Sequence, residues 1–121
     1  LSSTHAGNAL CCAAGLANLE FLSDLEFQKK LKNKIKIFEE RSNTLLKYKC
    51  VTNVNVKGMV SGIIIDNTPR TNKIVEYCIL NGVLPVWTKR ESIKLGPPLT
   101  ITIDAIHETF DVIEQGIQKY E

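Results

Sequence analysis

The chain has 121 residues and a mass of 13.5 kDa, which is enough for one ordinary domain but too little for two. Hydrophobic residues make up 44% of the chain and charged residues 23%, a globular composition that excludes disorder. The formal net charge is only +2, whereas a dedicated nucleic-acid-binding module is usually more basic. No apolar run approaches the roughly 18–20 residues of a membrane-spanning helix. We therefore expect neither a nucleic acid nor a membrane as a partner.

The first long element expected is a helix over residues 9–22. This segment is nearly all apolar, consists mostly of alanine, cysteine and glycine, contains no proline, and follows Asn8 as a plausible N-cap. A helix that is small-sided and apolar all round should be buried against close neighbours. The rest of so short a chain can hardly surround it, which indicates that a partner surface is missing.

The cysteines indicate the cellular compartment. Adjacent Cys11 and Cys12 cannot easily pair with each other, and no C-x-x-C spacing is present to hold zinc. Together with Cys50 and Cys78 they lie in apolar surroundings, which predicts four small core residues in a reducing compartment. The N-terminal residues show no signal peptide, so the expected location is the cytoplasm.

A second helix is expected over about residues 25–47, with Ser23 or Asp24 as its cap and an apolar stripe near the 3.6-residue period. A turn over residues 66–70 should precede a short helix that opens at Thr71 or Asn72. Thr102 should cap the last helix. Runs of β-branched and apolar residues predict four strands, over residues 51–56, 59–65, 83–87 and 92–95.

The order of these elements is helix, helix, strand, strand, helix, strand, strand, helix. This order predicts an α+β fold: a small, largely antiparallel sheet of about four strands with helices packed on one face, preceded by two helices.

Few side chains carry obvious chemistry. The lysines of residues 29–36 are best explained as a solvated helix face, because acidic residues dilute them. Lys94 on its own is typical of a strand-edge charge. The hydroxyls of Ser2, Ser3 and Thr4 precede a helix start, where they suit either a bound phosphate or simple helix capping. No general base, nucleophile or metal site is evident, so no catalytic residue is assigned.

Two stretches of the chain nevertheless resemble a known family. Residues 1–17 read LSSTHAGNALCCAAGLA, and residues 93–102 read IKLGPPLTIT. The first resembles the segment S-T-(aromatic)-G-G-N-P-L-(A/G)-C-A-A-A-L-A of class III pyridoxal-phosphate-dependent aminotransferases, which are fold-type-I enzymes. The second resembles that family's (I/V)-R-(L/F)-x-P-P-L-x-(I/V)-(T/S), near the C-terminus. Weaker matches at residues 56–62 and 81–84 lie between them in the right order.

This resemblance implies that residues 1–23 end the large domain and that residues 24–121 form the C-terminal small domain. The family's large domain also carries the Schiff-base lysine, which has no counterpart in this chain. The chain alone is therefore expected to be inactive. The full-length protein would transfer an amino group between an amino compound and an oxo acid or aldehyde, either between two molecules or as an internal shift.

The resemblance also implies particular binding residues. Thr4, with Ser3 beside it, matches the threonine that binds the phosphate of pyridoxal 5'-phosphate in the neighbouring subunit, which implies a homodimer. Lys94 stands where many members have an arginine that binds a substrate carboxylate. A lysine keeps the charge but loses the two-pronged geometry, and Arg90, four residues earlier, is the alternative.

The competing hypothesis comes from another functional class: a stand-alone α+β binding or dimerisation module without catalysis. The aminotransferase hypothesis predicts an upstream large domain that carries the lysine. The module hypothesis predicts a natural start near Leu1.

Overall fold

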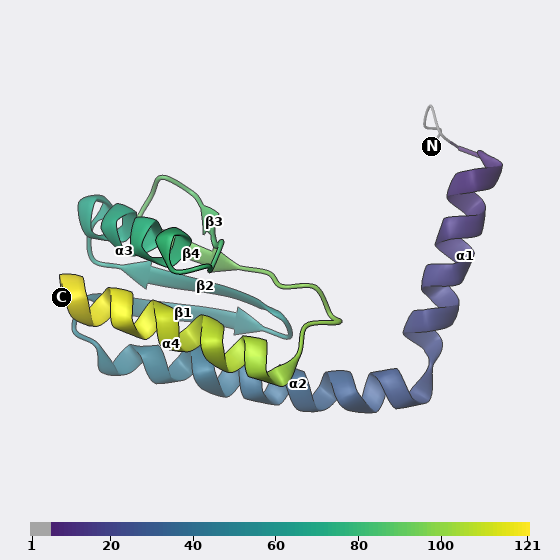
Figure 1. Cartoon of the computed structure of the whole chain (residues 1–121), viewed down its shortest axis with the longest axis horizontal. Coiled ribbons are helices and arrows are strands. Elements are labelled where there is room, and N and C mark those ends of the chain that lie inside the picture. Colours follow the sequence, from purple (N-terminus) through teal and green to yellow (C-terminus); the bar gives the residue numbers. More distant parts are fainter. Residues whose placement is uncertain (1–5) are drawn as a thin grey trace. The chain divides into compact units, whose positions relative to one another are not determined.

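The computed structural model describes residues 6–121 and confirms the expected order of elements (Figure 1). The chain divides into two compact units, residues 1–33 and 34–121. The expected boundary after residue 23, between a large and a small domain, concerns a different division and stays a prediction. No helix within residues 6–121 has both the length and the apolar character needed to cross a membrane.

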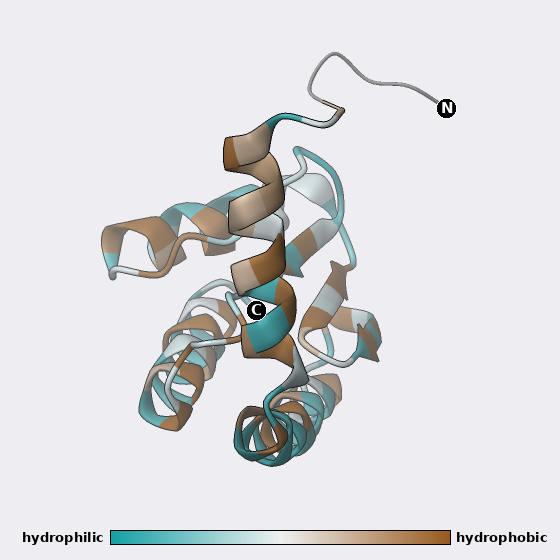
Figure 2. Cartoon of the chain, turned by 90° about the vertical axis from the view of Figure 1, so that its right-hand side faces the viewer, coloured by the Kyte–Doolittle hydropathy of each residue, from teal (hydrophilic) through white to brown (hydrophobic). Residues whose placement is uncertain are grey.

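Helix α1 (Ala9–Ser23) begins at its expected cap. The Asn8 Oδ1 atom accepts hydrogen bonds from the amides of Leu10 and Cys11, at 3.0 and 3.1 Å. No α1 side chain is buried by the described residues, although much of the helix is apolar (Figure 2). The prediction of four core cysteines is therefore wrong for Cys11 and Cys12, which are exposed because none of residues 6–121 buries a side chain of their helix.

Helix α2 (Leu25–Thr44) is separated from α1 by one non-helical residue, Asp24. Of the two caps considered, Asp24 is the one used, since its Oδ1 accepts a hydrogen bond from the Phe27 amide at 2.6 Å. The ring centroids of Phe21 in α1 and Phe27 in α2 lie 4.4 Å apart. The α-helix ends three residues before the expected position, because residues 45–47 form the tighter 3₁₀ turn η1 (Leu45–Lys47).

The four strands form one antiparallel sheet in the order β1-β2-β4-β3. The expected third strand is shorter than predicted. The Val83 amide donates to the Cys78 carbonyl at the end of the preceding helix, and Pro85 has no amide hydrogen to give to a neighbouring strand. The strands are β1 (Val51–Lys57), β2 (Val60–Ile65), β3 (Val86–Trp87) and β4 (Ser92–Leu95).

Helix α3 (Thr68–Leu80) begins three residues before the expected Thr71. The Asn67 Oδ1 atom accepts from the Arg70 amide at 2.9 Å and caps the helix. Pro69 lies in the first turn, where its missing amide hydrogen costs no helical hydrogen bond. Residues 68–70, interpreted as part of a turn, are therefore the start of the helix. At the other end, Gly82 takes the positive φ of 84° that favours glycine after a helix, as expected.

Helices cover one face of the sheet (Figure 1). Helix α4 (Ile103–Tyr120) starts at Thr102, whose hydroxyl caps the Ala105 amide as expected. The rings of Phe38 from α2 and Phe110 from α4 meet edge to face with centroids 5.3 Å apart. Isoleucine is the most frequent residue in the core between helices and sheet: Ile63, Ile65, Ile74, Ile93, Ile106, Ile113 and Ile117 are all buried.

The contact between α3 and α4 depends on a glycine. A Cβ atom at Gly116 would lie 3.1 Å from the Tyr77 Cδ1 atom and 3.4 Å from the Ile74 Cγ2 atom. We expect Gly116→Val to lower the free energy of unfolding by about 1–3 kcal/mol, because the larger side chain must push the two helices apart. Urea unfolding measures this. Gly96→Ala is the control, since its added Cβ meets nothing within 4 Å; an equal loss in both variants would contradict the prediction.

Candidate functional site

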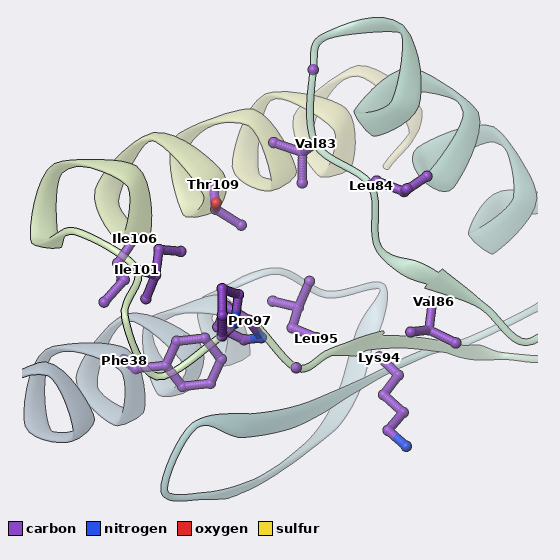
Figure 3. Close-up of a pocket in the computed structure, with 13 residues that line it drawn as sticks. Phe38, Val83, Leu84, Val86, Lys94, Leu95, Pro97, Ile101, Ile106 and Thr109 are labelled. Atoms are coloured by element: carbon purple, nitrogen blue, oxygen red, sulfur yellow. The ribbon is translucent and has the colours of Figure 1, made fainter. Parts of the chain in front are cut away.

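The uncovered face of the sheet carries the site residue Lys94. Side chains alternate along β4, so that Ile93 and Leu95 are buried in the core while Lys94 is exposed. Figure 3 shows Lys94 and Leu95 pointing to opposite sides of this strand. In register, Lys94 lies between Gly62 of β2 and Val86 of β3.

This face is electropositive. The four strands contain no acidic residue, and the open face presents the side chains of Lys57 and Lys94. Within residues 6–121, Lys94 forms no ion pair. An unpaired ammonium on an acid-free surface attracts an anionic group, so this face fits a carboxylate better than a cation.

Arg90 has a different environment. It lies in the turn between β3 and β4, where its amide donates to the Thr88 hydroxyl at 3.3 Å. The adjacent Glu91 is held in its charged form: the Thr68 hydroxyl donates to it at 2.5 Å, and this bond, a backbone hydrogen bond and the Arg90 cation lower the pKa of the carboxyl group. A carboxylate next to Arg90 offsets its charge, whereas Lys94 has no such neighbour on its strand.

The expected phosphate residues, Ser3 and Thr4, lie outside the described residues. The described start of α1 nevertheless limits where a phosphate can bind. The amides of Leu10 and Cys11 already donate to the Asn8 side chain, and the Cys12 amide donates to the Asn8 carbonyl at 2.9 Å. The amides of residues 10–12 are therefore not free to bind a phosphate at the start of α1.

A cavity of about 300 Å³ on the helix side of β4 was not anticipated from the sequence. Figure 3 shows apolar side chains converging on it, among them Val83, Leu95, Ile101 and Ile106. The lining residues come from α2, β3, β4 and α4 and from the loops before β3 and α4. No local sequence signal could therefore reveal the cavity. Lys94 also lines this cavity, but Figure 3 shows its side chain pointing away from the converging apolar side chains.

Metal chemistry finds no support among residues 6–121, which contain no cluster of three or more histidine, cysteine or acidic side chains that could hold a metal ion. Cys78 is equally unsuited to nucleophilic chemistry, because burial raises the pKa of its thiol to about 11.

The state of Glu91 is open to a direct test. We expect Thr68→Val to raise the pKa of Glu91 toward its ordinary value, because the variant removes the hydroxyl that favours the carboxylate. A carboxyl whose pKa is lowered by folding stabilises the fold at neutral pH, and this contribution is lost as the pH falls through the folded pKa. An NMR titration of the Glu91 side chain measures the change. Thr44→Val is the control, because it removes a hydroxyl that donates to the Arg41 carbonyl oxygen instead. It should leave the pKa of Glu91 unchanged.

Comparisons with known proteins identify the family of the chain and bear out its fold. The family model described as aminotransferase class-III matches residues 1–117. Acetylornithine aminotransferase of Caldanaerobacter subterraneus is 31% identical over 98% of this chain, and rat mitochondrial ornithine aminotransferase is also 31% identical over 98%. The structure of acetylornithine aminotransferase from Elizabethkingia anophelis superposes with a TM-score of 0.82 at 28% identity, over 99% of this chain.

The same comparisons show how much of those proteins the chain represents. It covers 30% and 27% of the two sequence relatives and 32% of the solved structure. The matched region is the C-terminal part of the relatives. Since the family model matches almost the whole length of the chain, the chain belongs to the class III aminotransferases and corresponds to their C-terminal region.

Proposed function

We propose that this chain is the C-terminal part of an enzyme that transfers an amino group between an amino compound and an oxo acid or aldehyde. The observation that carries the proposal is Lys94, an unpaired cation on an acid-free sheet face, at the position of the arginine in the family motif. The family uses pyridoxal 5'-phosphate. When bound, this cofactor supplies a carbonyl carbon that takes up the amino group and a ring that withdraws electrons.

Lys94 holds the substrate by its carboxylate. The ammonium stands on the central part of the sheet, where the packing of Ile93 and Leu95 fixes the strand beneath it. Arg90 is the weaker choice because Glu91, one residue away, offsets its charge. Two of the relatives are named for ornithine and acetylornithine, and both compounds carry a carboxylate. We therefore assign a carboxylate-bearing amino donor as the substrate class.

Ser3 and Thr4 bind the cofactor phosphate of the neighbouring subunit. The match of residues 1–117 to the family model supports this role, while the amides of Leu10 and Cys11 donate to Asn8 and are not free for a phosphate. The exposed apolar surface of α1 supports contacts with the enzyme's large domain and with a second subunit of a cytoplasmic homodimer. The lysine that binds the cofactor covalently belongs to the large domain, so the isolated 121-residue chain is inactive.

The cofactor role is tested on the complete product of the gene. With added pyridoxal phosphate, we expect the visible absorbance band of lysine-bound cofactor in the complete protein and no such band in the 121-residue chain. Thr4→Ala should release the cofactor faster on dialysis, because a phosphate contact is lost. Thr100→Ala, which removes an exposed threonine hydroxyl elsewhere, should retain the cofactor like the parent. A complete protein without the band would leave the stand-alone binding module as the remaining hypothesis.

The carboxylate role is tested by kinetics. Lys94→Gln should raise the KM for a carboxylate-bearing donor by about tenfold or more, since one charge-assisted hydrogen bond is lost. The KM for an amine donor without a carboxylate should stay the same, and so should kcat for both donors. Arg90→Gln is the matched control with the same loss of charge. A larger effect at Arg90 than at Lys94 would assign the carboxylate to Arg90 instead.

A further inference from the structure

Within residues 6–121, no contact explains why position 62 is a glycine. It lies in the middle of β2, between two hydrogen-bonded strands, and its φ is one that any residue adopts. An added Cβ would meet only the Asn55 carbonyl oxygen, at 4.0 Å. A glycine inside a strand weakens it, and one that neither backbone nor packing requires often marks the close approach of a ligand or another chain.

The glycine separates two polar side chains on the open face. Across the sheet, Asn55 of β1 lies opposite Gly62, and Gly62 lies opposite Lys94 of β4. Neighbouring strands are about 4.8 Å apart, so the backbones of Asn55 and Lys94 stand about 10 Å apart. Apart from the Asn55 carbonyl oxygen, no atom of the described residues lies within 4 Å of a Cβ built at Gly62, so a carboxylate has room above this residue.

Both flanking side chains present hydrogen-bond donors. The Asn55 Oδ1 atom accepts from the Asn53 amide group at 3.3 Å, which leaves the Asn55 Nδ2 group to donate elsewhere. Lys94 contributes up to three N–H donors and a positive charge. No acidic residue occurs in the four strands to compete for these donors. The gap is therefore complementary to an anion with two acceptor oxygens.

We infer that Asn55, Gly62 and Lys94 form one carboxylate subsite, in which Asn55 is a second binding residue. A lysine offers a single point charge, whereas an arginine binds both oxygens of a carboxylate in a fixed fork. Here the Lys94 ammonium binds one oxygen and the Asn55 amide binds the other, while Gly62 leaves room for the group above β2. Because the group bound is the substrate carboxylate, the subsite rests on the proposed function.

The subsite is tested on the 121-residue chain, without cofactor or activity. Glutarate is the probe and glutaramide its neutral counterpart, at equal ionic strength, with ¹⁵N NMR as the measurement. We expect glutarate to shift the Asn55 side-chain amide and the Gly62 backbone amide along a saturable curve. Glutaramide should shift neither. An unsaturable response, or equal shifts with both compounds, would overturn the subsite.

Three variants localise the effect. Gly62→Val fills the gap, Asn55→Asp replaces a donor by a negative charge, and Lys94→Gln removes the cation. Each should weaken glutarate binding by at least about tenfold, the loss expected for one charge-assisted hydrogen bond. Lys57→Gln is the matched control, because it removes a lysine from the same face of the sheet. Lys57 pairs with Val60 and not with Gly62, so it lies outside the proposed subsite. Equal weakening in Lys57→Gln would indicate general charge attraction and contradict the subsite.

A separate measurement tests the premise about Gly62. If no contact in this chain requires the glycine, Gly62→Ala should raise the melting temperature by about 2–5 °C through its better fit to a strand. A lower melting temperature would show that Gly62 is structural and would overturn the inference. Glutarate binding by the chain can fail while the complete protein still binds pyridoxal phosphate, so the failure of the subsite is distinguishable from that of the proposed function.

Discussion

The strict alternation of side chains along the two central strands is the constraint on which the site depends. In β2 the buried positions are Ser61, Ile63 and Ile65, and in β4 they are Ile93 and Leu95. A shift of the pairing by one residue would bring the Lys94 ammonium into a core of isoleucines, at a cost of several kcal/mol for an unpaired charge. The packing of the helix layer thus sets which side chains the open face presents.

Polar contacts in turn fix the helix layer where α4 ends. The Arg70 guanidinium donates to the carbonyls of Tyr120 and Glu121 at 2.8 and 3.3 Å, and it also pairs with Asp66. The Glu121 carboxylate accepts from the backbone amide of Lys49 at 2.5 Å and from that of Cys50 at 3.3 Å, immediately before β1. The end of α4 is therefore joined both to the start of α3 and to the start of the sheet. These contacts hold the core surface of the sheet against its helices without using any group on the open face.

The sequence was sufficient for those features that local periodicity and capping determine. Asn8, Asp24 and Thr102 act as caps, and the isoleucine spacing of the last helix predicts its buried face. Pro69 was misleading, because the same residue type starts helices and forms turns, and only the Asn67 cap distinguishes the two cases. The exposure of Cys11 and Cys12 contradicts the prediction of core cysteines but agrees with the expectation that residues 9–22 need a partner surface, since the described residues bury no α1 side chain.

The candidate site likewise has one part that the sequence predicts and another that it does not. Alternation in residues 93–95 places Lys94 opposite to the core, but its pairing with Gly62, and through Gly62 with Asn55, depends on contacts between strands far apart in the sequence. The one local signal is a glycine within the β-branched run of residues 60–65, a position where backbone entropy disfavours it. Ser3 and Thr4 rest on the family motif, and their roles stay predictions.

Both motifs that identify the family include residues that the described chain leaves exposed. The first runs into α1, which has no buried side chain, and the second includes the exposed Lys94. The core between them is built from isoleucine, valine and phenylalanine, which many α+β domains share. Residues that pack against one another can exchange for others of similar volume, whereas a residue that must meet a ligand, a cofactor or another part of an enzyme is restricted by chemistry outside the chain. A lysine in place of the motif's arginine is therefore informative: it keeps the positive charge, and the proposed subsite assigns the second oxygen of a carboxylate to Asn55, two strands away in β1.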